Sequence, residues 1–377
     1  MKKVDNRRQV AILVPAHNEE KVIADTLHSL LRIAPARDIF VVNDGSKDKT
    51  AAIAKKLVPH VLTLKPNQGK AGAMNTAIRH FKFTKRYKYV MPIDADTKVT
   101  AGFLKNTLPI LDQDKKSEIA CVIGKVIGGS HSMTTAYRLW EYEIAQTIHK
   151  KAQAILNAII VCPGPSTVYR SELFISNSIP TGTLTEDMDF TFLIHRKKLG
   201  KLAFTDKAVV ITQDPNTVKD YVKQIDRWYT GFWQCLIKHN IPWGGQMLDF
   251  EVALLALEGL YNGLIVLAFI FVLPYVLITN TRILLAPFVI DLLFFILPTF
   301  AWTMIRHKSW NILKYLPHFY LMRVLGSLVF FKSFIKVSLG LDKGMSWNKA
   351  KRYTLSPAEA PVPKPRLLPA FRFRFNI

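Results

Sequence analysis

The sequence predicts an α/β domain with a mostly parallel sheet, followed by a region of membrane helices. From residue 10 to about residue 215, short β-branched runs alternate with helical patterns, which is typical of α/β folds. Two apolar stretches follow, Val252–Ile278 and Ile283–Ile305, and each exceeds the roughly 20 residues that a membrane crossing needs. The 377 residues are 49% hydrophobic, with a net charge of +23 and three cysteines. This composition excludes disorder, collagen-like sequence and a disulfide-rich scaffold.

The expected strands and helices alternate along the first part of the chain. The candidate strands are Val10–Val14, Ile39–Val42, His60–Leu64, Tyr89–Ile93 and Ile119–Ile127. The helical patterns between them are Glu20–Arg32, Asp48–Leu57, Ala71–Phe81 and Ala101–Leu111. Polar clusters follow three of the strands, at His17–Glu19, Asp44–Ser46 and Asp94–Asp96. Ligands bind outside the carboxyl ends of the strands in open α/β sheets, so we expect these clusters to share one ligand-binding edge.

Several common binding motifs are absent from the sequence. It lacks the glycine-rich phosphate loops of dinucleotide-binding and P-loop proteins. It also lacks a helix-turn-helix, zinc-finger spacing and an aromatic RNA-binding motif, so we expect no nucleic-acid partner. The positive charge instead suggests anionic lipids or phosphorylated substrates.

Asp94 and Asp96 follow the apolar strand Tyr89–Ile93. Alternate strand residues point to one face, so the two carboxylates converge if the strand continues through them. Neighbouring carboxylates repel unless a cation neutralises them. Mg²⁺ or Mn²⁺ binds carboxylates and leaves room for substrate phosphates. The pattern indicates a metal–diphosphate site, and a solvated turn is the alternative.

Four further residues have chemistry that suits a ligand site. Asp44 ends a strand, where its side chain could accept a hydrogen bond from a pyrimidine base. Lys70 precedes a helix, whose N-terminus favours phosphate, although a surface lysine is the alternative. Glu186 and Asp187 begin a helix that they could simply stabilise. One of these carboxylates could also be the general base for a sugar hydroxyl.

Gln224, Arg227 and Trp228 share one face of a helical pattern, because they are spaced i, i+3 and i+4. An arginine can pair with two phosphate oxygens at once. The indole of Trp228 offers a flat apolar surface on which a sugar ring can pack. This face therefore suits both a diphosphate and a sugar.

The orientation in the membrane follows from charge. The apolar run Val10–Val14 is shorter than the roughly 7–15 residues of a signal peptide core, so we expect the N-terminal part to be cytosolic. The positive-inside rule also places Arg306–Lys308 and the basic tail on the cytosolic side. A third apolar stretch, Tyr315–Phe331 with Arg323 near its middle, could cross the membrane or lie in its interface. The charge distribution favours two spans.

The expected division has three parts. They are an α/β domain over residues 1–245, a membrane region over 246–341 with two to three hydrophobic helices, and a basic tail over 342–377. The tail contains the proline-rich stretch Pro357–Pro369, which we expect to be extended.

Six motifs in order resemble the family 2 glycosyltransferases. The order matches the processive membrane branch, which contains poly-N-acetylglucosamine, hyaluronan, chitin and cellulose synthases. The motifs are Pro15–Glu20, Asn43–Ser46, Asn67–Lys70 with Asn75, Asp94–Asp96, Thr185–Asp187 and Gln224–Trp228. The resemblance covers Val10 to Trp228. It implies a GT-A (Rossmann-like) fold, a UDP-sugar donor, a divalent metal cofactor (Mg²⁺ or Mn²⁺) and inversion at the anomeric carbon.

The resemblance also implies a role for each matching residue. Asp187 would be the base that activates the acceptor hydroxyl, with Glu186 beside it. Asp96 would hold the metal, and Trp228 would contact the acceptor-end sugar. The donor-binding residues would be Glu19, Asp44, Lys70, Asp94, Asp96, Gln224 and Arg227.

The expected function is that of a membrane-bound inverting glycosyltransferase that adds a sugar to a growing polysaccharide. The expected donor is UDP-N-acetylglucosamine or UDP-glucose, and the other partners are a glycan or lipid-linked acceptor and membrane lipids. The expected location is the plasma (inner) membrane, as a multi-pass protein with a cytoplasmic catalytic domain. Two alternatives stay open: transfer of a single sugar to a lipid, and a catalytically silent membrane protein that binds nucleotide sugar.

Overall fold

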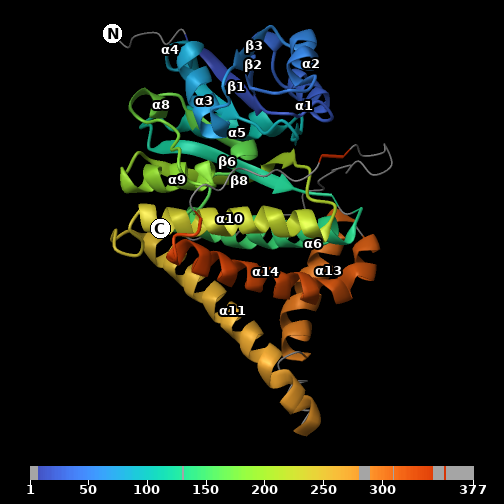
Figure 1. Cartoon of the computed structure of the whole chain (residues 1–377). Helices are drawn as coiled ribbons and strands as arrows, with labels where there is room; N and C mark the ends of the chain where they lie inside the picture. The colour runs from blue at the N-terminus through green and yellow to red at the C-terminus, as the bar shows by residue number, and fades with distance from the viewer. Residues whose placement is uncertain (1–6, 130, 280–288, 309, 343–351, 354–377) are drawn as a thin grey trace.

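The computed structural model describes residues 7–129, 131–279, 289–308, 310–342 and 352–353. An α/β part lies above a helical part in the view of Figure 1. The α/β part contains one eight-stranded sheet with the order β3-β2-β1-β4-β7-β6-β8-β5. The strands are β1 (Arg8–Ala16), β2 (Ile39–Asp44), β3 (His60–Leu64), β4 (Tyr87–Pro92), β5 (Lys98–Val99), β6 (Ile119–Ile127), β7 (Thr167–Arg170) and β8 (Lys201–Ile211).

The sheet is mostly parallel. Parallel pairs join β3 to β2, β2 to β1, β1 to β4, and β6 to β8. β7 runs antiparallel between β4 and β6, and β5 runs antiparallel to β8. The predicted α/β fold is therefore confirmed, and all five predicted strands are present. The sequence patterns did not reveal β5, β7 and β8, because the first two are very short and charged residues interrupt the third.

Helices cover both faces of the first half of the sheet, which explains why its strands are continuously apolar. The four helices α1 (Ile23–Leu31), α2 (Thr50–Leu57), α3 (Gly69–His80) and α5 (Phe103–Gln113) match the predicted helical patterns to within a few residues. On one face, Ile12 and Val14 of β1 pack in a core with α1 and α5. On the other face, Ala11 and Leu13 pack with α3. Two one-turn helices complete this part, α4 (Phe83–Arg86) and α8 (Leu173–Ser176).

β4, the strand before Asp94 and Asp96, ends before it reaches these two residues. Their carboxylates would converge on one face only if the strand continued through them. β4 stops at Pro92, and residues 94–97 form a turn in which the Thr97 N–H donates to the Asp94 carbonyl at 3.1 Å. The strand does not continue through Asp94 and Asp96, so that condition of the prediction is wrong. The turn directs the two carboxylates to different partners.

Two helices lie between the sheet and the lowest helices. They are α6 (Met133–Ile144) and α10 (Val218–Lys238) (Figure 1). α6 continues through a π-helical turn, η2 (Ala145–His149), into α7 (Lys150–Ile155), and α9 (Glu186–Arg196) lies beside the sheet. The lowest helical segments are α11 (Met247–Thr279), η4 (Leu292–Ile296), α13 (Leu297–His307), η5 (Trp310–Tyr315) and α14 (Leu316–Ser338).

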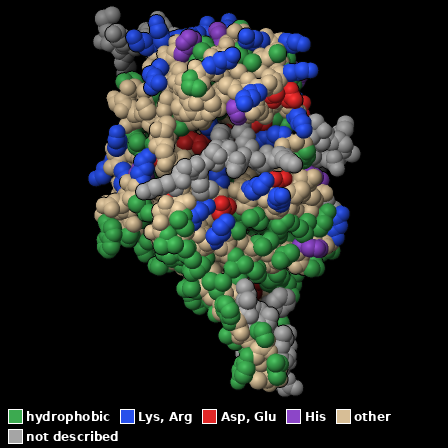
Figure 2. Space-filling model, viewed as in Figure 1, with side chains coloured by type: hydrophobic (Ala, Val, Ile, Leu, Met, Phe, Trp, Pro, Cys, Tyr) green, Lys and Arg blue, Asp and Glu red, His purple; other side chains and the backbone are tan. Residues whose placement is uncertain are grey.

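The helical part exposes much apolar surface. Two stretches among the described residues are long and apolar enough to cross a membrane, Met247–Ala268 and Val289–His307, and only 17% and 22% of their apolar windows are buried. On the face shown in Figure 2, hydrophobic side chains gather over the lower helices, and Lys and Arg lie mainly above them. The third predicted stretch forms α14, which packs along α10. Residues 280–288, which include the start of the second predicted apolar stretch, and the proline-rich tail lie outside the described residues.

Candidate active site

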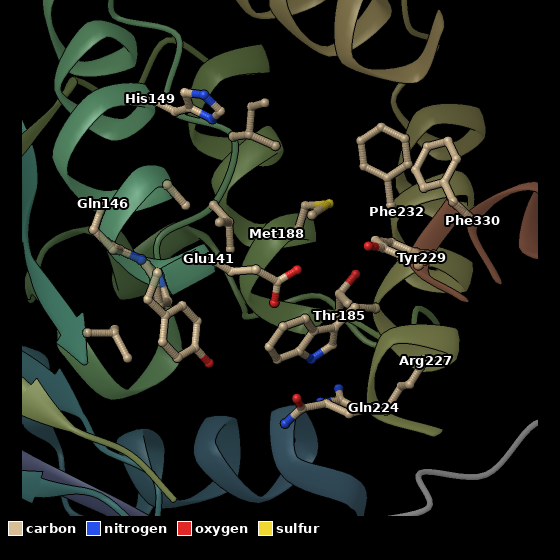
Figure 3. Close-up of a pocket in the computed structure, with 18 of the residues that line it drawn as sticks. Glu141, Gln146, His149, Thr185, Met188, Gln224, Arg227, Tyr229, Phe232 and Phe330 are labelled. Atoms are coloured by element: carbon tan, nitrogen blue, oxygen red, sulfur yellow. The ribbon is translucent and has the colours of Figure 1, made fainter. Parts of the chain in front are cut away.

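A cavity of about 1000 Å³ lies between the carboxyl edge of the sheet and the helices α6, α10, α11 and α14. Side chains from all of these elements line it, and Figure 3 shows a part of its wall. Nine of the ten predicted site residues lie in this lining, namely Glu19, Lys70, Asp94, Asp96, Glu186, Asp187, Gln224, Arg227 and Trp228. The remaining residue, Asp44, does not. The fold thus brings motifs together that lie more than 200 residues apart in the sequence.

Lys70, at the start of α3, is a buried cation between two acids. Its Nζ lies 2.7 Å from Asp94 Oδ1 and 2.8 Å from Glu186 Oε1. Burial works against the charged ammonium, but Asp94 and Glu186 outweigh it and hold the pKa of Lys70 above its usual range. A Cβ on Gly164 would lie 3.0 Å from this Nζ, so the glycine leaves space beside the ion pair. The site therefore holds a fixed positive charge where the resemblance implies a diphosphate.

Asp96 and Glu19 both bind a second cation, Arg352. Arg352, which follows α14 in the sequence, contacts Asp96 Oδ2 through Nη1 at 2.5 Å. Its Nε and Nη2 donate to the two carboxylate oxygens of Glu19 at 2.9 and 3.1 Å. Burial opposes the charge, but the two acids hold the pKa of Arg352 above its usual range. Asp94 and Asp96 thus point to separate cations, as the end of β4 requires.

The Glu19–Asp96 pair fits a divalent metal ion in its chemistry. Both carboxylates already surround one positive group, and oxygen ligands are those that Mg²⁺ and Mn²⁺ prefer. Among the described residues, no group of three or more His, Cys, Asp or Glu side chains could hold a metal alone. This is compatible with an ion of the Mg²⁺ type, which keeps several waters and binds through one or two carboxylates plus substrate phosphates.

Asp187 lies at the start of α9, next to Glu186. Its Oδ1 accepts a hydrogen bond from the Met188 N–H at 2.9 Å. Burial raises the pKa of Asp187, and the neighbouring charge of Glu186 adds to this effect. A carboxylate with a raised pKa is a stronger base, which is the property that proton removal from a hydroxyl needs.

The helix α10 presents Gln224, Arg227 and Trp228 to the cavity. Arg227 Nη1 donates to the Leu184 carbonyl at 3.0 Å, which fixes the guanidinium close to α9. Burial lowers the pKa of Arg227, while Glu186 and Asp187 work in the opposite direction. Gln224 Oε1 is buried and has no hydrogen-bond partner among the described residues. Figure 3 shows Gln224 and Arg227 together at one end of the cavity wall.

Asp44 belongs to the neighbouring part of the same sheet edge. Its Oδ1 accepts from the Gln68 N–H at 2.7 Å, and its carbonyl accepts from Asn67 Nδ2 at 2.7 Å. The residue thereby fixes the loop that leads to Lys70. Its contact with a base stays a prediction.

Further charged residues line the cavity, among them Glu141 of α6, Asp214 after β8 and Arg352 after α14. Arg138 of α6 is not part of the lining, but it pairs with Glu141 and Asp214. Asp214 is 2% exposed, and burial raises its pKa to about 6 against the attraction of Arg138. Of these residues, Arg352 had a sequence signal, because it belongs to the basic tail over residues 342–377.

The mostly parallel sheet with a cavity at its carboxyl edge is a GT-A-like α/β fold. Residues 11–176 match the sequence model of Glycosyl transferase family 2. The match assigns residues 11–176 to a family 2 glycosyltransferase domain, in agreement with the four motifs that lie within them.

Named relatives agree with this assignment. The chain is 28% identical over 242 residues to the poly-beta-1,6-N-acetyl-D-glucosamine synthase of Staphylococcus epidermidis, covering 62% of this chain and 57% of that one. The Staphylococcus aureus synthase is 26% identical with the same coverage. The chain thus matches little more than half the length of these relatives. A mannosyltransferase from Pyrobaculum calidifontis, solved with GDP-Man and Mn²⁺, has a TM-score of 0.57 at 18% identity, covering 84% of this chain and 87% of that one. This likeness shows the fold.

Proposed function

We propose that the protein is a membrane-bound inverting glycosyltransferase that moves a sugar from a UDP-sugar to a growing polysaccharide. The observation that carries the proposal is the single cavity in which Asp187 and Glu186 meet the cations Lys70 and Arg227. The relatives are named as synthases of poly-β-1,6-N-acetylglucosamine, which supports UDP-N-acetylglucosamine as the donor. UDP-glucose is the second donor to test.

The reaction would be a single displacement. Asp187 takes the proton from the acceptor hydroxyl while the oxygen attacks the anomeric carbon. The bond between this carbon and the diphosphate oxygen breaks, and UDP leaves with the bonding electrons. Lys70 and Arg227 stabilise the charge that develops on the diphosphate, because they are partly buried cations that their partners hold in place. Attack from the face opposite the leaving group inverts the anomeric centre.

Asp96 would hold the divalent metal, with Glu19 beside it. When bound, the ion would neutralise part of the diphosphate charge. The support is that the carboxylates of Glu19 and Asp96 both bind one cation, the guanidinium of Arg352. The other donor residues, Asp44, Asp94 and Gln224, would contact the nucleotide and the sugar.

The membrane location rests on the exposed apolar helices. The stretches Met247–Ala268 and Val289–His307 have a mean hydropathy of 1.6 and are mostly unburied. At the end of the second stretch, Arg306 Nε and His307 Nε2 lie 3.0 and 2.7 Å from the Glu143 carboxylate of α6. This contact keeps the basic end on the side of the α/β domain, in agreement with the positive-inside rule. We infer a cytoplasmic catalytic domain at the inner membrane.

The cavity suits an acceptor that arrives from the membrane side, because its lining continues along α11 and α14. Polar residues of this extension include Glu258, Asn262 and Ser327, which can bind sugar hydroxyls. Apolar residues such as Leu254 and Val324 lie among them. The apolar share of the wall favours a second candidate, transfer of one sugar to a lipid acceptor.

A donor screen tests the proposed function. Membranes that contain the full chain are incubated with Mn²⁺ and single UDP-sugars, and released UDP is measured. We expect release with UDP-N-acetylglucosamine or UDP-glucose and none with the Asp187→Asn chain. A folded wild-type chain that releases UDP from no donor would contradict transferase activity and favour a silent nucleotide-sugar-binding protein.

A further inference from the structure

A buried arginine lies directly behind the Trp228 ring. Arg138 belongs to α6 and is 4% exposed. Its Cζ lies 4.6 Å from the centroid of the Trp228 ring. Trp228 itself is half-buried and lines the cavity. The indole therefore contacts a fixed cation and at the same time faces the space where an acceptor would bind.

Neighbouring side chains fix the position of the Arg138 guanidinium. Nη1 donates to Glu141 Oε2 at 2.6 Å, Nη2 donates to the Tyr142 hydroxyl at 2.8 Å, and Asp214 Oδ1 lies 3.7 Å from Nε. Burial works against the charged form, but Tyr142, Glu141 and Asp214 outweigh it and hold the pKa of Arg138 well above its usual range. The group is thus a permanent cation that its partners restrain. A cation over an indole ring is attracted most strongly where water is excluded.

The same guanidinium also lies 4.5 Å from the centroid of the Tyr142 ring and 5.8 Å from that of the Tyr221 ring. Glu141 reaches the cavity from α6, and Figure 3 shows its carboxylate pointing toward Thr185 and Tyr229 on the opposite wall. The cluster therefore connects α6, the end of β8 and the Trp228 face of α10. A displacement of Arg138 would change the tilt of the indole, whereas Lys70 and Asp96 are held by other partners, Glu186 and Arg352.

We propose that Arg138 is a positioning residue that holds the Trp228 ring in the orientation that binds the acceptor sugar. The inference rests on the proposed function, because it assigns Trp228 to the acceptor. Arg138 does not touch the donor residues, so its contribution belongs to acceptor binding. Sugar rings pack on aromatic faces, and a tilted indole would offer less contact area.

The test measures the acceptor KM and the donor KM separately. The full chain in detergent is assayed with UDP-N-acetylglucosamine and a β-1,6-linked N-acetylglucosamine trisaccharide as the acceptor probe. Arg138→Lys keeps the charge but loses the planar group and its two-sided hydrogen bonds. We expect the acceptor KM to rise about tenfold, while the donor KM changes less than about twofold.

A double-variant cycle shows whether Arg138 acts through Trp228. In a Trp228→Leu background, Arg138→Lys should raise the acceptor KM no further, because the ring that it positions is gone. Arg170→Lys is the matched control. Arg170 also binds a carboxylate, Asp114, at 3.0 Å, and it lies outside the cavity lining. This control should leave the acceptor KM unchanged.

The outcomes separate the two proposals. An unchanged acceptor KM in Arg138→Lys, equal rises in both KM values, or an equal rise in the Trp228→Leu background would overturn the inference. If Arg138→Lys fails to fold, Glu141→Gln loosens the same guanidinium, and an acceptor KM that it leaves unchanged would also overturn the inference. A wild-type chain without transfer to any acceptor would instead overturn the proposed function itself.

Discussion

Asp187 combines burial with a neighbouring negative charge, and both raise the pKa of its carboxyl group. Asp187→Asn keeps the shape of the side chain and removes the carboxylate that we propose as the base. We expect turnover to fall by roughly 10²–10⁴-fold, whereas UDP binding stays within a few-fold. The measurement combines UDP release with a titration of UDP.

Asp226→Asn is a suitable control for this variant, because Asp226 binds Lys336 at 3.0 Å and lies outside the cavity lining. The control should keep its turnover. Full turnover in Asp187→Asn would exclude this residue as the base.

Asp96 is the residue proposed to hold the metal. Asp96→Ala should abolish the difference between UDP affinity with Mn²⁺ and UDP affinity in a chelator, because the ion loses its protein ligand. Calorimetric titration of UDP in both buffers measures this difference. A variant that retains the full Mn²⁺ effect would show that the ion binds elsewhere.

Asp214 gives the protein a pH-dependent stability. Its pKa is raised from 3.8 to about 6 by burial, so the folded chain binds this proton more tightly than the unfolded chain. The stabilisation is complete below about pH 4 and is lost as the pH rises through about 6. Asp214→Asn should raise the free energy of unfolding at pH 7 by about 1–3 kcal/mol.

Thermal unfolding between pH 5 and pH 8 measures this effect. The wild-type chain should lose stability over this range relative to Asp214→Asn. A variant that is less stable than wild type at pH 7 would mean that the ionised Asp214 stabilises Arg138 by more than its burial costs.

At the scale of elements, the strand ends were the most informative part of the sequence. β1, β2 and β4 are apolar because helices cover both faces of the sheet, and a polar cluster follows each of them. The position of a polar cluster directly after each of these strands was therefore sufficient to predict that one edge of the sheet binds a ligand. The end of β4 was not predictable, because a turn and a continued strand fit the same Asp-Ala-Asp pattern.

The contact between α11 and α14 depends on small residues. A Cβ on Gly259 would overlap the Phe330 ring, which also packs against Tyr229, Phe232 and Trp233 and has little room to move. Gly259→Ala should therefore lower the free energy of unfolding by about 1–3 kcal/mol. Unfolding of the detergent-solubilised chain measures this change.

The same pair of helices supplies a control. A Cβ on Gly326 would meet its nearest neighbour, the Tyr229 hydroxyl, only at 3.9 Å. Gly326→Ala should be neutral or slightly stabilising, because alanine favours the helix. Equal effects of the two substitutions would contradict the described packing of α11 on α14.

At the scale of the whole molecule, some residues in and around the cavity belong to recognisable sequence motifs and others do not. Lys70, Glu186 and Arg227 stand in motifs whose spacing shows their chemistry. Arg138 pairs locally with Glu141 and Tyr142 of α6, but its contacts with Asp214 and the Trp228 ring form only when α6, the end of β8 and α10 come together. The sequence therefore revealed most of the residues that line the cavity beside Lys70, but not the network around Arg138.

The size of the product tests the central claim most directly. The full chain in membranes is supplied with labelled UDP-N-acetylglucosamine and Mn²⁺, and the labelled product is separated by length with Asp187→Asn as the blank. We expect a ladder of increasing lengths in the wild type and none in the blank. A product extended by one sugar only would contradict polymer growth and favour the lipid acceptor, and a folded wild-type chain without labelled product would contradict sugar transfer.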